Sequence, residues 1–297
     1  MLDYPALAAL SAVIRSGTFD AAGKALSVTP SAVSQRIKGL EERLGLPLVV
    51  RDTPCRPTDA GVRLLAHFDR VSLLEHDMFN EGAPWAGALE VSHPTLKVAV
   101  NSDSMATWVP AAAAAFAAGS SSTLTLVLDD ENRTPELLRR GEVIAAVTTT
   151  SKPVAGCHAI LLGAMRYIAI ASPSFRDRHF ANGVTAKRLA DAPVLRFDPH
   201  DELQKRWIAK AVGSAIEGPT HSTPSTQGML DFALAGVAWS LTPEPVAAPL
   251  LASGRLVHLK KDLSIEVPLF WQNLRIAART LDSLSRAVRS ESKRWLV

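Results

Sequence analysis

The sequence predicts an α/β protein that begins with a winged helix-turn-helix, continues through a long linker helix, and ends in a two-lobed α/β body. Three observations support this fold class. Capped amphipathic helices fill most of the first 80 residues. Apolar strands then alternate with helices up to about residue 150, which is the pattern of a parallel sheet. The same alternation restarts near Arg166, so a second lobe follows the first.

Two helices are predicted at the start of the chain. Residues 5–16 place Leu7, Leu10 and Ile14 at helical spacing on one face. The tripeptide SGT then breaks the helix, and Thr18 can cap a short second helix. A tight turn separates this second helix from a third.

The third helix carries polar chemistry on its outer face. Thr29 can act as its N-cap, and Pro30 fits the first helical position because the N–H of that position would be unpaired anyway. Its inner face is an apolar stripe, and its outer face is small or hydrogen-bonding. A helix needs such residues to approach the major groove and read base edges. The alternative is an amphipathic helix whose polar face is merely solvated.

The residues after the third helix favour the winged helix-turn-helix. Residues 48–51 form a predicted strand, and Arg51 and Arg56 frame a Pro-rich hairpin that can contact phosphates. Residues 24–63 contain seven Lys or Arg against four Asp or Glu, an excess that phosphate binding favours. We assign residues 1–58 to this domain. The predicted DNA contacts are Thr29, Ser31, Ala32, Ser34, Gln35, Arg36, Lys38, Arg51 and Arg56.

A long amphipathic helix follows the wing. Thr58 can cap it, and an apolar stripe recurs every three or four residues as far as Met78. The stripe is too long for so small a winged domain. We therefore expect it to pair with its copy in a homodimer, because such domains usually read two half-sites by symmetry. The alternative is docking onto the body of its own chain. Linker and hinge together are assigned to residues 59–92.

The body is predicted as two α/β lobes. Strands at 96–100, 124–128 and 143–147, separated by helices, indicate a parallel sheet with right-handed crossovers. We assign lobe I to about 93–163 and 266–297, and lobe II to about 164–265. Two such lobes resemble a periplasmic-binding-protein body, in which ligands bind between the lobes at the carboxyl ends of strands.

Further elements are expected within these lobes. One helix should begin between Ser104 and Pro110, and another should run from Thr134 to Gly141. The predicted elements of lobe II are strands at 167–171, 192–197 and 237–241, a helix at 201–212, and a helix capped by Thr226. A strand at 267–271 and a basic C-terminal helix return to lobe I.

Motifs along the whole chain resemble a known family. The segment TFDAAGKALSVTPSAVSQRIKGLEERLGLPLVVR, followed by PTDAG, closely resembles the DNA-binding end of LysR-type transcriptional regulators. The segments VNSDSMATWVP, RRGEVIAAVTT, MRYIAIASP and VPLFWQ resemble the arginine- and lysine-responsive ArgP/LysG subgroup. This chain has Ser102 where that subgroup usually has an alanine. The resemblance implies control of the export of basic amino acids.

The charged groups of an amino-acid ligand indicate which protein groups should bind it. Backbone N–H groups at the starts of helices suit its carboxylate, whereas its ammonium group and basic side chain require carboxylates. The candidate residues follow strands or begin helices: Asp103, Ser104, Thr107, Asp130, Glu131, Thr148, Thr149, Asp201, Thr223, Ser225 and Thr226. The resemblance supports Asp103, Ser104 and Thr107 most, through the motif NxDSxxTW. Without it, Ser104 and Thr226 are as readily explained as helix caps, and Asp130 and Glu131 as solvated loop charges.

The leading hypothesis is a transcriptional regulator that senses L-lysine or L-arginine. Ligand would close the cleft and change the angle between subunits on an interrupted palindromic operator in double-stranded DNA. The expected assembly is a homodimer or, as the family implies, a homotetramer. RNA polymerase is a further candidate partner, and no cofactor or membrane is expected.

Two other functions were weighed. An amino-acid-binding transport component would suit the two lobes but not the helix-turn-helix or the absent signal sequence. An enzyme is not expected, because the sequence has no GxSxG, HExxH, phosphate-loop or GxGxxG motif. The composition agrees with a cytoplasmic regulator: 297 residues suggest about two domains, the net charge is +3, and two separated cysteines predict neither a disulfide nor a metal site.

Overall fold

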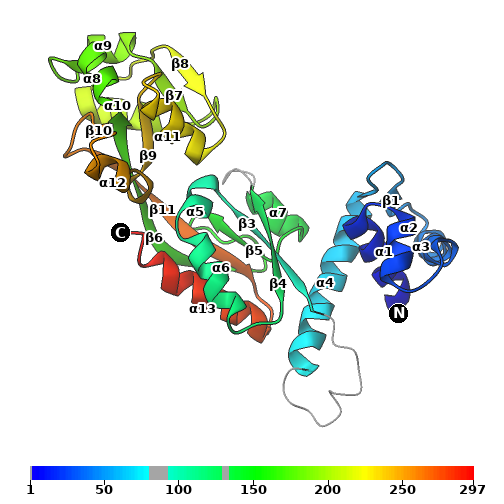
Figure 1. The fold of residues 1–297 in the computed structure, drawn as a ribbon. Coiled ribbons are helices and arrows are strands. Elements are labelled where there is room, and N and C mark those ends of the chain that lie inside the picture. The colour runs from blue at the N-terminus through cyan, green and yellow to red at the C-terminus, as the bar shows by residue number, and fades with distance from the viewer. Residues whose placement is uncertain (1, 80–92, 129–133) are drawn as a thin grey trace.

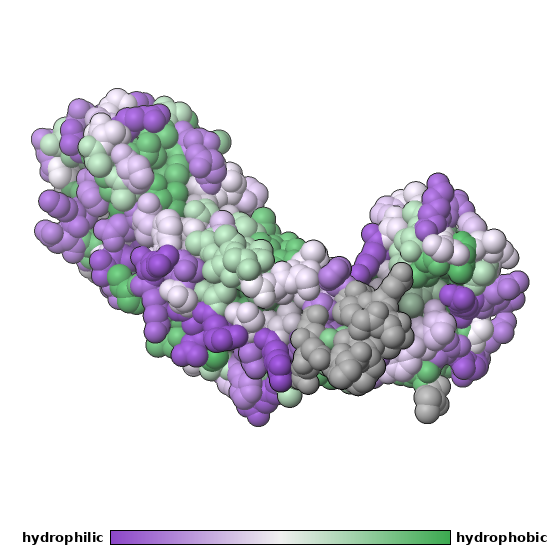
Figure 2. All heavy atoms as spheres, turned by 60° about the horizontal axis from the view of Figure 1, so that its bottom comes forward, coloured by the Kyte–Doolittle hydropathy of each residue, from purple (hydrophilic) through white to green (hydrophobic). Residues whose placement is uncertain are grey.

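The computed structural model describes residues 2–79, 93–128 and 134–297. A small helical head, a single linker helix and an elongated two-lobed body follow one another (Figure 1). The head and the body have separate hydrophobic cores. In the space-filling view of Figure 2 the head stands apart from the body as a mass of its own.

The head is a winged helix-turn-helix, as the sequence predicts. Its elements are α1 (Tyr4–Ser16), α2 (Phe19–Ala25), α3 (Pro30–Leu44), β1 (Val49–Val50) and β2 (Arg56–Pro57). The Thr18 hydroxyl accepts a hydrogen bond from Ala21 N at 3.2 Å, and the Thr29 hydroxyl accepts one from Ala32 N at 3.1 Å. Both predicted N-caps are confirmed. β1 and β2 pair antiparallel and form the wing.

The linker helix α4 (Asp59–Phe79) contacts both the head and the body. Its start is capped by Thr58, whose hydroxyl accepts from Gly61 N at 3.1 Å. Leu65 belongs to the core of the head, and Leu73 belongs to the core of the body. Docking onto its own chain, the alternative considered for this helix, therefore occurs. Leu74 and Met78 remain 42% and 44% exposed, and this is the surface left for the predicted dimer contact.

Lobe I contains the predicted parallel sheet. Its elements are β3 (Thr95–Val100), α5 (Ser102–Ala106), α6 (Val109–Ala117), β4 (Thr123–Leu128), α7 (Thr134–Arg140) and β5 (Ala145–Thr148). β3 pairs in parallel with both β4 and β5. The helix predicted to begin between Ser104 and Pro110 is α6, which begins at Val109, whereas the short α5 before it was not predicted. The chain forms two helices there, because Thr107 leaves helical geometry and Pro110 suits only the first turn of a new helix.

Two long antiparallel strands join the lobes. β6 (Cys157–Ala171) pairs with the whole of β11 (Ser264–Leu274) from Cys157 to Ile168, with a register shift between Leu269 and Phe270. The order of this sheet is β10-β6-β11-β5-β3-β4, and β9 also pairs with β6. The predicted strands at 167–171 and 267–271 were too short. Gly163 and Arg166 interrupt the apolar pattern, and only cross-strand pairing extends the strand past them.

Lobe II completes the body. Its elements are α8 (Pro173–Phe180), α9 (Ala186–Asp191), β7 (Val194–Arg196), α10 (Leu203–Val212), β8 (Thr220–Ser222), α11 (Thr226–Leu234), β9 (Ser240–Pro243), α12 (Glu244–Ala252) and β10 (Val257–His258). The chain then returns through β11 to α13 (Arg279–Ser292), which packs on α6 in lobe I. The sequence suggested Thr226 as the cap of α11, and this was wrong. Ser225 is the cap, and its hydroxyl accepts from Gly228 N at 3.2 Å.

Candidate DNA interface and ligand cleft

The outer face of α3 is open to solvent. Its predicted DNA contacts fall into two groups: Thr29, Ser31, Gln35, Arg36 and Lys38 are exposed, whereas Ala32 and Ser34 are half-buried. The Thr29 hydroxyl already caps the helix, so it orders the helix start rather than reaching outward. Lys38 lies 3.6 Å from Glu42, also at the surface. The exposed side chains form one face that a major groove can accept.

Gly23, which the sequence reasoning did not single out, lies where the turn of the helix-turn-helix leaves no room for a side chain. A Cβ atom at Gly23 would lie 2.8 Å from Val28 O and 3.1 Å from Pro30 N. Both separations are shorter than ordinary contacts of a Cβ atom. The turn between α2 and α3 therefore requires glycine, and this turn sets the angle of α3.

The two wing arginines are in different environments. The Arg51 guanidinium lies 5.1 Å from the centre of the Phe19 ring, a cation–π arrangement that orients it at the surface. Arg56 is paired with Asp52 within the wing. Arg51 therefore keeps its full charge for a phosphate, whereas the charge of Arg56 is partly neutralised.

A cleft of about 580 Å³ lies between the two lobes. Residues from α5, β6, the 197–206 segment, the start of α11 and β9 line it. Its size is within the range of small-molecule sites. Four lining side chains are acidic, namely Asp103, Asp198, Asp201 and Glu202. The basic groups on the lining are Arg206 and His200, and Lys205 lies 2.9 Å from Glu202 and offsets part of its charge. Acidic groups still outnumber basic ones, so the cleft favours a cationic ligand.

Asp103 accepts two short hydrogen bonds from hydroxyl groups in the cleft. The Tyr167 hydroxyl donates to its Oδ2 at 2.6 Å, and the Thr226 hydroxyl donates to its Oδ1 at 2.6 Å. Burial raises the pKa of Asp103, the two hydroxyl donors oppose that rise, and the nearby Asp201 carboxylate adds to it. A buried carboxylate of this kind gains most from a cationic partner.

Ser102 extends this network across the cleft. Its hydroxyl lies 2.9 Å from the Thr226 hydroxyl and accepts from Thr226 N at 3.4 Å. Because the Thr226 proton goes to Asp103, the Ser102 proton is the one shared with Thr226. α5 of lobe I is thereby bonded to α11 of lobe II. We call the residues Ser102, Asp103, Tyr167 and Thr226 the inter-lobe network.

Asp201 shapes the cleft wall. Its carboxylate accepts from Phe197 N at 3.2 Å, Leu203 N at 3.0 Å and Gln204 Nε2 at 3.0 Å. These bonds hold the turn that presents Asp198 to the cleft. The sequence reasoning included Asp201 but missed its neighbours. The motif DPHDE after a buried strand was the available signal.

Apart from Thr149, the remaining predicted effector residues within the described ranges lie beside the cleft rather than on its lining. The Thr107 hydroxyl donates to Asp103 O at 2.7 Å, and the Ser104 hydroxyl is buried without a partner among the described residues. Thr148 is buried and accepts from Gln272 Nε2 at 3.2 Å, whereas Thr149 does line the cleft. Thr223 and Ser225 flank the start of α11.

Two predicted effector residues cannot be placed in the structure, and several residues that line the cleft were not predicted. Asp130 and Glu131 lie outside the described residues. Tyr167, Asp198, Glu202 and Arg206 line the cleft but were not predicted. Within the described ranges, no three His, Cys, Asp or Glu side chains gather as a metal ion requires. No helix in the same ranges is long and apolar enough to span a bilayer.

A winged helix-turn-helix joined to a two-lobed body with a central cleft defines the class of ligand-responsive DNA-binding regulators. Residues 5–62 match the family model of the bacterial regulatory helix-turn-helix protein, lysR family, and residues 90–292 match the LysR substrate binding domain. The chain belongs to the LysR family of transcriptional regulators.

Three relatives are similar over almost their whole length. The transcriptional regulator LysG of Mycobacterium tuberculosis is 42% identical over 289 residues, which cover 97% of this chain and 93% of the relative. The crystal structure of ArgP from the same species has a TM-score of 0.80 and 41% identity, covering 100% and 99% of the two chains. LysG from Corynebacterium glutamicum with bound effector Arg has a TM-score of 0.69 and 37% identity, with 99% of each chain covered.

Family membership decides between the functions weighed from the sequence. The chain is a DNA-binding transcriptional regulator, and the prediction that it is not an enzyme is confirmed by its relatives. The transport alternative finds no support, because the relatives are regulators over both the head and the body.

Proposed function

We propose that this regulator senses L-arginine or L-lysine in the inter-lobe cleft and thereby changes how it binds an operator. The observation that carries the proposal is the half-buried Asp103 of lobe I, which two hydroxyl groups hold in a cleft that Asp198 and Glu202 of lobe II also line. A basic amino acid has two cationic ends, and the cleft offers an acidic group to each. The Corynebacterium glutamicum relative holds arginine, which agrees with this assignment.

Each functional group of the ligand has a proposed partner. Its α-ammonium pairs with Asp103, and its side-chain cation reaches Asp198 and Glu202. Its α-carboxylate is held by Arg206 and by Thr149. The inter-lobe network holds Asp103 in place for this contact.

DNA recognition is proposed for the opposite end of the molecule. Gln35 and Ser31 read base edges from the exposed face of α3, while Arg36, Lys38 and Arg51 neutralise phosphates. The operator is an interrupted palindrome read by a homodimer or homotetramer, with α4 contributing Leu74 and Met78 to the pairing. The proposed target is a gene for export or metabolism of the amino acid. The regulator is proposed to act in the cytoplasm, with RNA polymerase as a further partner.

Calorimetry with a matched ligand pair tests this function. Citrulline has nearly the shape of arginine but lacks its side-chain charge. We expect arginine and lysine to bind and citrulline to bind at least about tenfold more weakly, since a lost charged hydrogen bond costs about 1.5–3 kcal/mol. Equal affinities for arginine and citrulline would contradict the assignment of the acidic wall.

A further inference from the structure

Asp77 is a buried carboxylate that neither the DNA interface nor the cleft uses. It lies near the end of α4 and is 9% exposed. Its oxygens accept from Thr280 N at 3.2 and 3.3 Å and from the Thr280 hydroxyl. The two residues are 203 positions apart in the chain. A buried charge requires such partners, so this contact ties the linker helix to a specific point of the body.

The point of contact is the start of α13. The N-cap position of this helix is occupied by Ala278, which makes no side-chain cap bond. An Asp, Ser or Thr at that position would normally accept from the second or third N–H of the helix. Asp77 supplies this acceptor from another element, and its negative charge is favourable at a helix N-terminus. α4 therefore caps α13.

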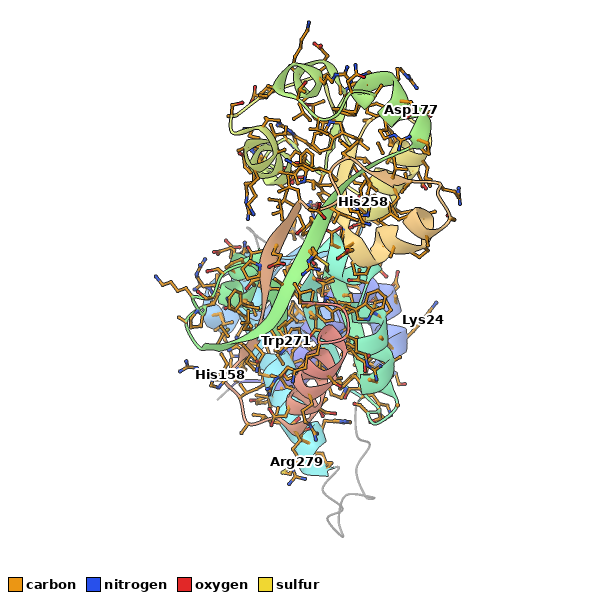
Figure 3. All side chains as sticks on the ribbon, turned by 90° about the vertical axis from the view of Figure 1, so that its left-hand side faces the viewer. Lys24, His158, Asp177, His258, Trp271 and Arg279 are labelled. Atoms are coloured by element: carbon orange, nitrogen blue, oxygen red, sulfur yellow. The ribbon has the colours of Figure 1, made fainter. Side chains whose placement is uncertain are left out.

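Neighbouring contacts hold the same end of α4. Leu73, one turn before Asp77, is buried in the same cluster as Leu281 of α13. The ring of His76, which is 3% exposed, lies 3.4 Å from the Ser122 hydroxyl of lobe I. Figure 3 shows Arg279, at the start of α13, next to the end of the linker helix. The capping bond therefore lies inside a packed interface.

The other half of α4 contacts both the head and lobe I. Asp69 lies 3.3 Å from Arg15 of α1 and 3.7 Å from Lys97 of β3, so it bridges head and lobe I. A Cβ atom at Gly141, where φ is +72°, would lie 2.7 Å from Ala66 Cβ, so lobe I approaches α4 closely there. One helix of 21 residues, about 30 Å long, thus carries both domains.

Two hydrogen bonds from neighbouring residues of β11 also lie between α13 and the side of the cleft. Trp271 Nε1 donates to the Ser285 hydroxyl of α13 at 2.9 Å, and Figure 3 shows Trp271 beside that helix. The next residue, Gln272, donates to Thr148 at 3.2 Å, one residue before the cleft-lining Thr149. α13 is therefore connected indirectly, through β11, to the strand that ends at the cleft, and directly to the linker through Asp77.

We propose that Asp77 is a positioning residue for regulation: by capping α13 it fixes the linker helix on lobe I, and the effector changes DNA binding only while this contact is intact. The proposal rests on the proposed function, since it concerns how the occupied cleft reaches the head. It assigns Asp77 no role in holding ligand or DNA.

Asp77→Ala in the full-length protein tests this inference, with L-arginine and L-lysine as probes. We expect calorimetric affinity for the effector to stay within about twofold of the native value, since Asp77 does not line the cleft. The effector-dependent change in operator affinity should fall to less than about one fifth of the native change, because the coupling between the two sites is lost. Thr280→Val should act in the same direction. Thr280→Ser keeps the hydroxyl and should restore the native response.

The control is Asp282→Ala, which removes an exposed acid from the first turn of α13 without touching α4. It should respond to the effector like the native protein. Asp77→Leu, which has a similar size but no acceptor, is the second variant should Asp77→Ala fail to fold. A native effector response in a folded Asp77 variant would overturn the proposal.

Hydrogen exchange separates this proposal from the proposed function. Asp77→Ala or Asp77→Leu should speed amide exchange in the first turn of α13, because both remove the acceptor, and Asp282→Ala should not. If neither amino acid binds the native protein, the proposed function fails, and exchange still decides whether Asp77 caps α13. Unchanged exchange in the Asp77 variant would overturn the capping role.

Discussion

The head and the cleft differ in how far apart in the chain their parts lie. The bonds that cap α2, α3 and α4 join residues three positions apart. Asp103 instead meets Tyr167 and Thr226, which are 64 and 123 positions away. A DNA-reading surface can therefore be presented by local structure alone. A ligand site between lobes exists only when the whole body has folded.

The largest expected effect lies in the cleft. Asp103→Ala should lower the affinity for arginine by roughly 100-fold or more, because truncating one partner of a buried charge pair costs about 2–5 kcal/mol. Operator affinity without effector should be unchanged. Calorimetry and fluorescence anisotropy measure the two quantities separately. Asp177→Asn, at the far end of lobe II (Figure 3), is the matched control and should bind arginine normally. A normal affinity in Asp103→Ala would mean that ligand binds elsewhere.

Gln35→Ala makes the corresponding change in the head. It should weaken operator binding by about 1–3 kcal/mol and leave non-specific DNA binding nearly unchanged, since this side chain is proposed to read bases. Anisotropy on operator and scrambled DNA gives both affinities. Gln227→Ala, an exposed glutamine on α11, is the control. Equal losses on both DNAs would mean that Gln35 does not read sequence.

Arg51→Ala sharpens the distinction between positioning and reading in the head. It should weaken both DNAs to a similar extent and reduce the slope of log affinity against log salt by about 0.9, the value for one phosphate contact. Arg56→Ala should have the smaller effect, because Arg56 is already paired with Asp52. The opposite order would show that the wing binds DNA through Arg56.

Prediction from the sequence succeeded where structure is local. Thr18, Thr29 and Thr58 were identified as caps because capping needs only neighbouring residues, and all three accept the expected bonds. Thr226 shows the limit of such reasoning. It was assigned as the cap of α11, but Ser225 caps that helix, and the Thr226 hydroxyl is free to cross the cleft to Asp103.

The missed residues of the cleft have a common physical reason. Tyr167 lies on a buried strand and reads as part of an apolar run, so nothing in its neighbours shows that its hydroxyl meets Asp103. Asp198 and Glu202 flank the predicted Asp201 and look like solvated loop charges until the fold turns them to the cleft. Asp77 was also missed, because its partner is 203 positions away.

Breaking the inter-lobe network should have a moderate effect. Thr226→Val keeps the shape of the side chain but removes its bonds to Asp103 and Ser102. We expect a loss of about 1–3 kcal/mol in unfolding free energy, because a buried carboxylate oxygen loses its donor. Urea denaturation measures it. Ser102→Ala combined with Thr226→Val should cost less than the sum of the single changes, and full additivity would mean that the two hydroxyls act independently.

The smallest expected effect is a pH dependence with opposite signs for stability and binding. Burial raises the pKa of Asp103 above its ordinary value of 3.8. In the pH window between the ordinary and the raised pKa, the folded protein without ligand therefore binds more protons than the unfolded protein. Its contribution to stability therefore decreases as pH rises through the window. Arginine requires the charged carboxylate, so its affinity should rise over the same range. Asp103→Asn should remove both trends, and their persistence would assign them to another group.

One titration tests the central claim most directly: that ligand in the cleft alters DNA binding by the head. Operator affinity is measured by anisotropy at increasing arginine, in the native protein and in Asp103→Ala. We predict that arginine shifts the native operator affinity by about 5–150-fold, the usual range of coupling between sites, and leaves the variant unchanged. An equal arginine effect in both proteins, or none in the native protein with lysine or arginine, would contradict the account.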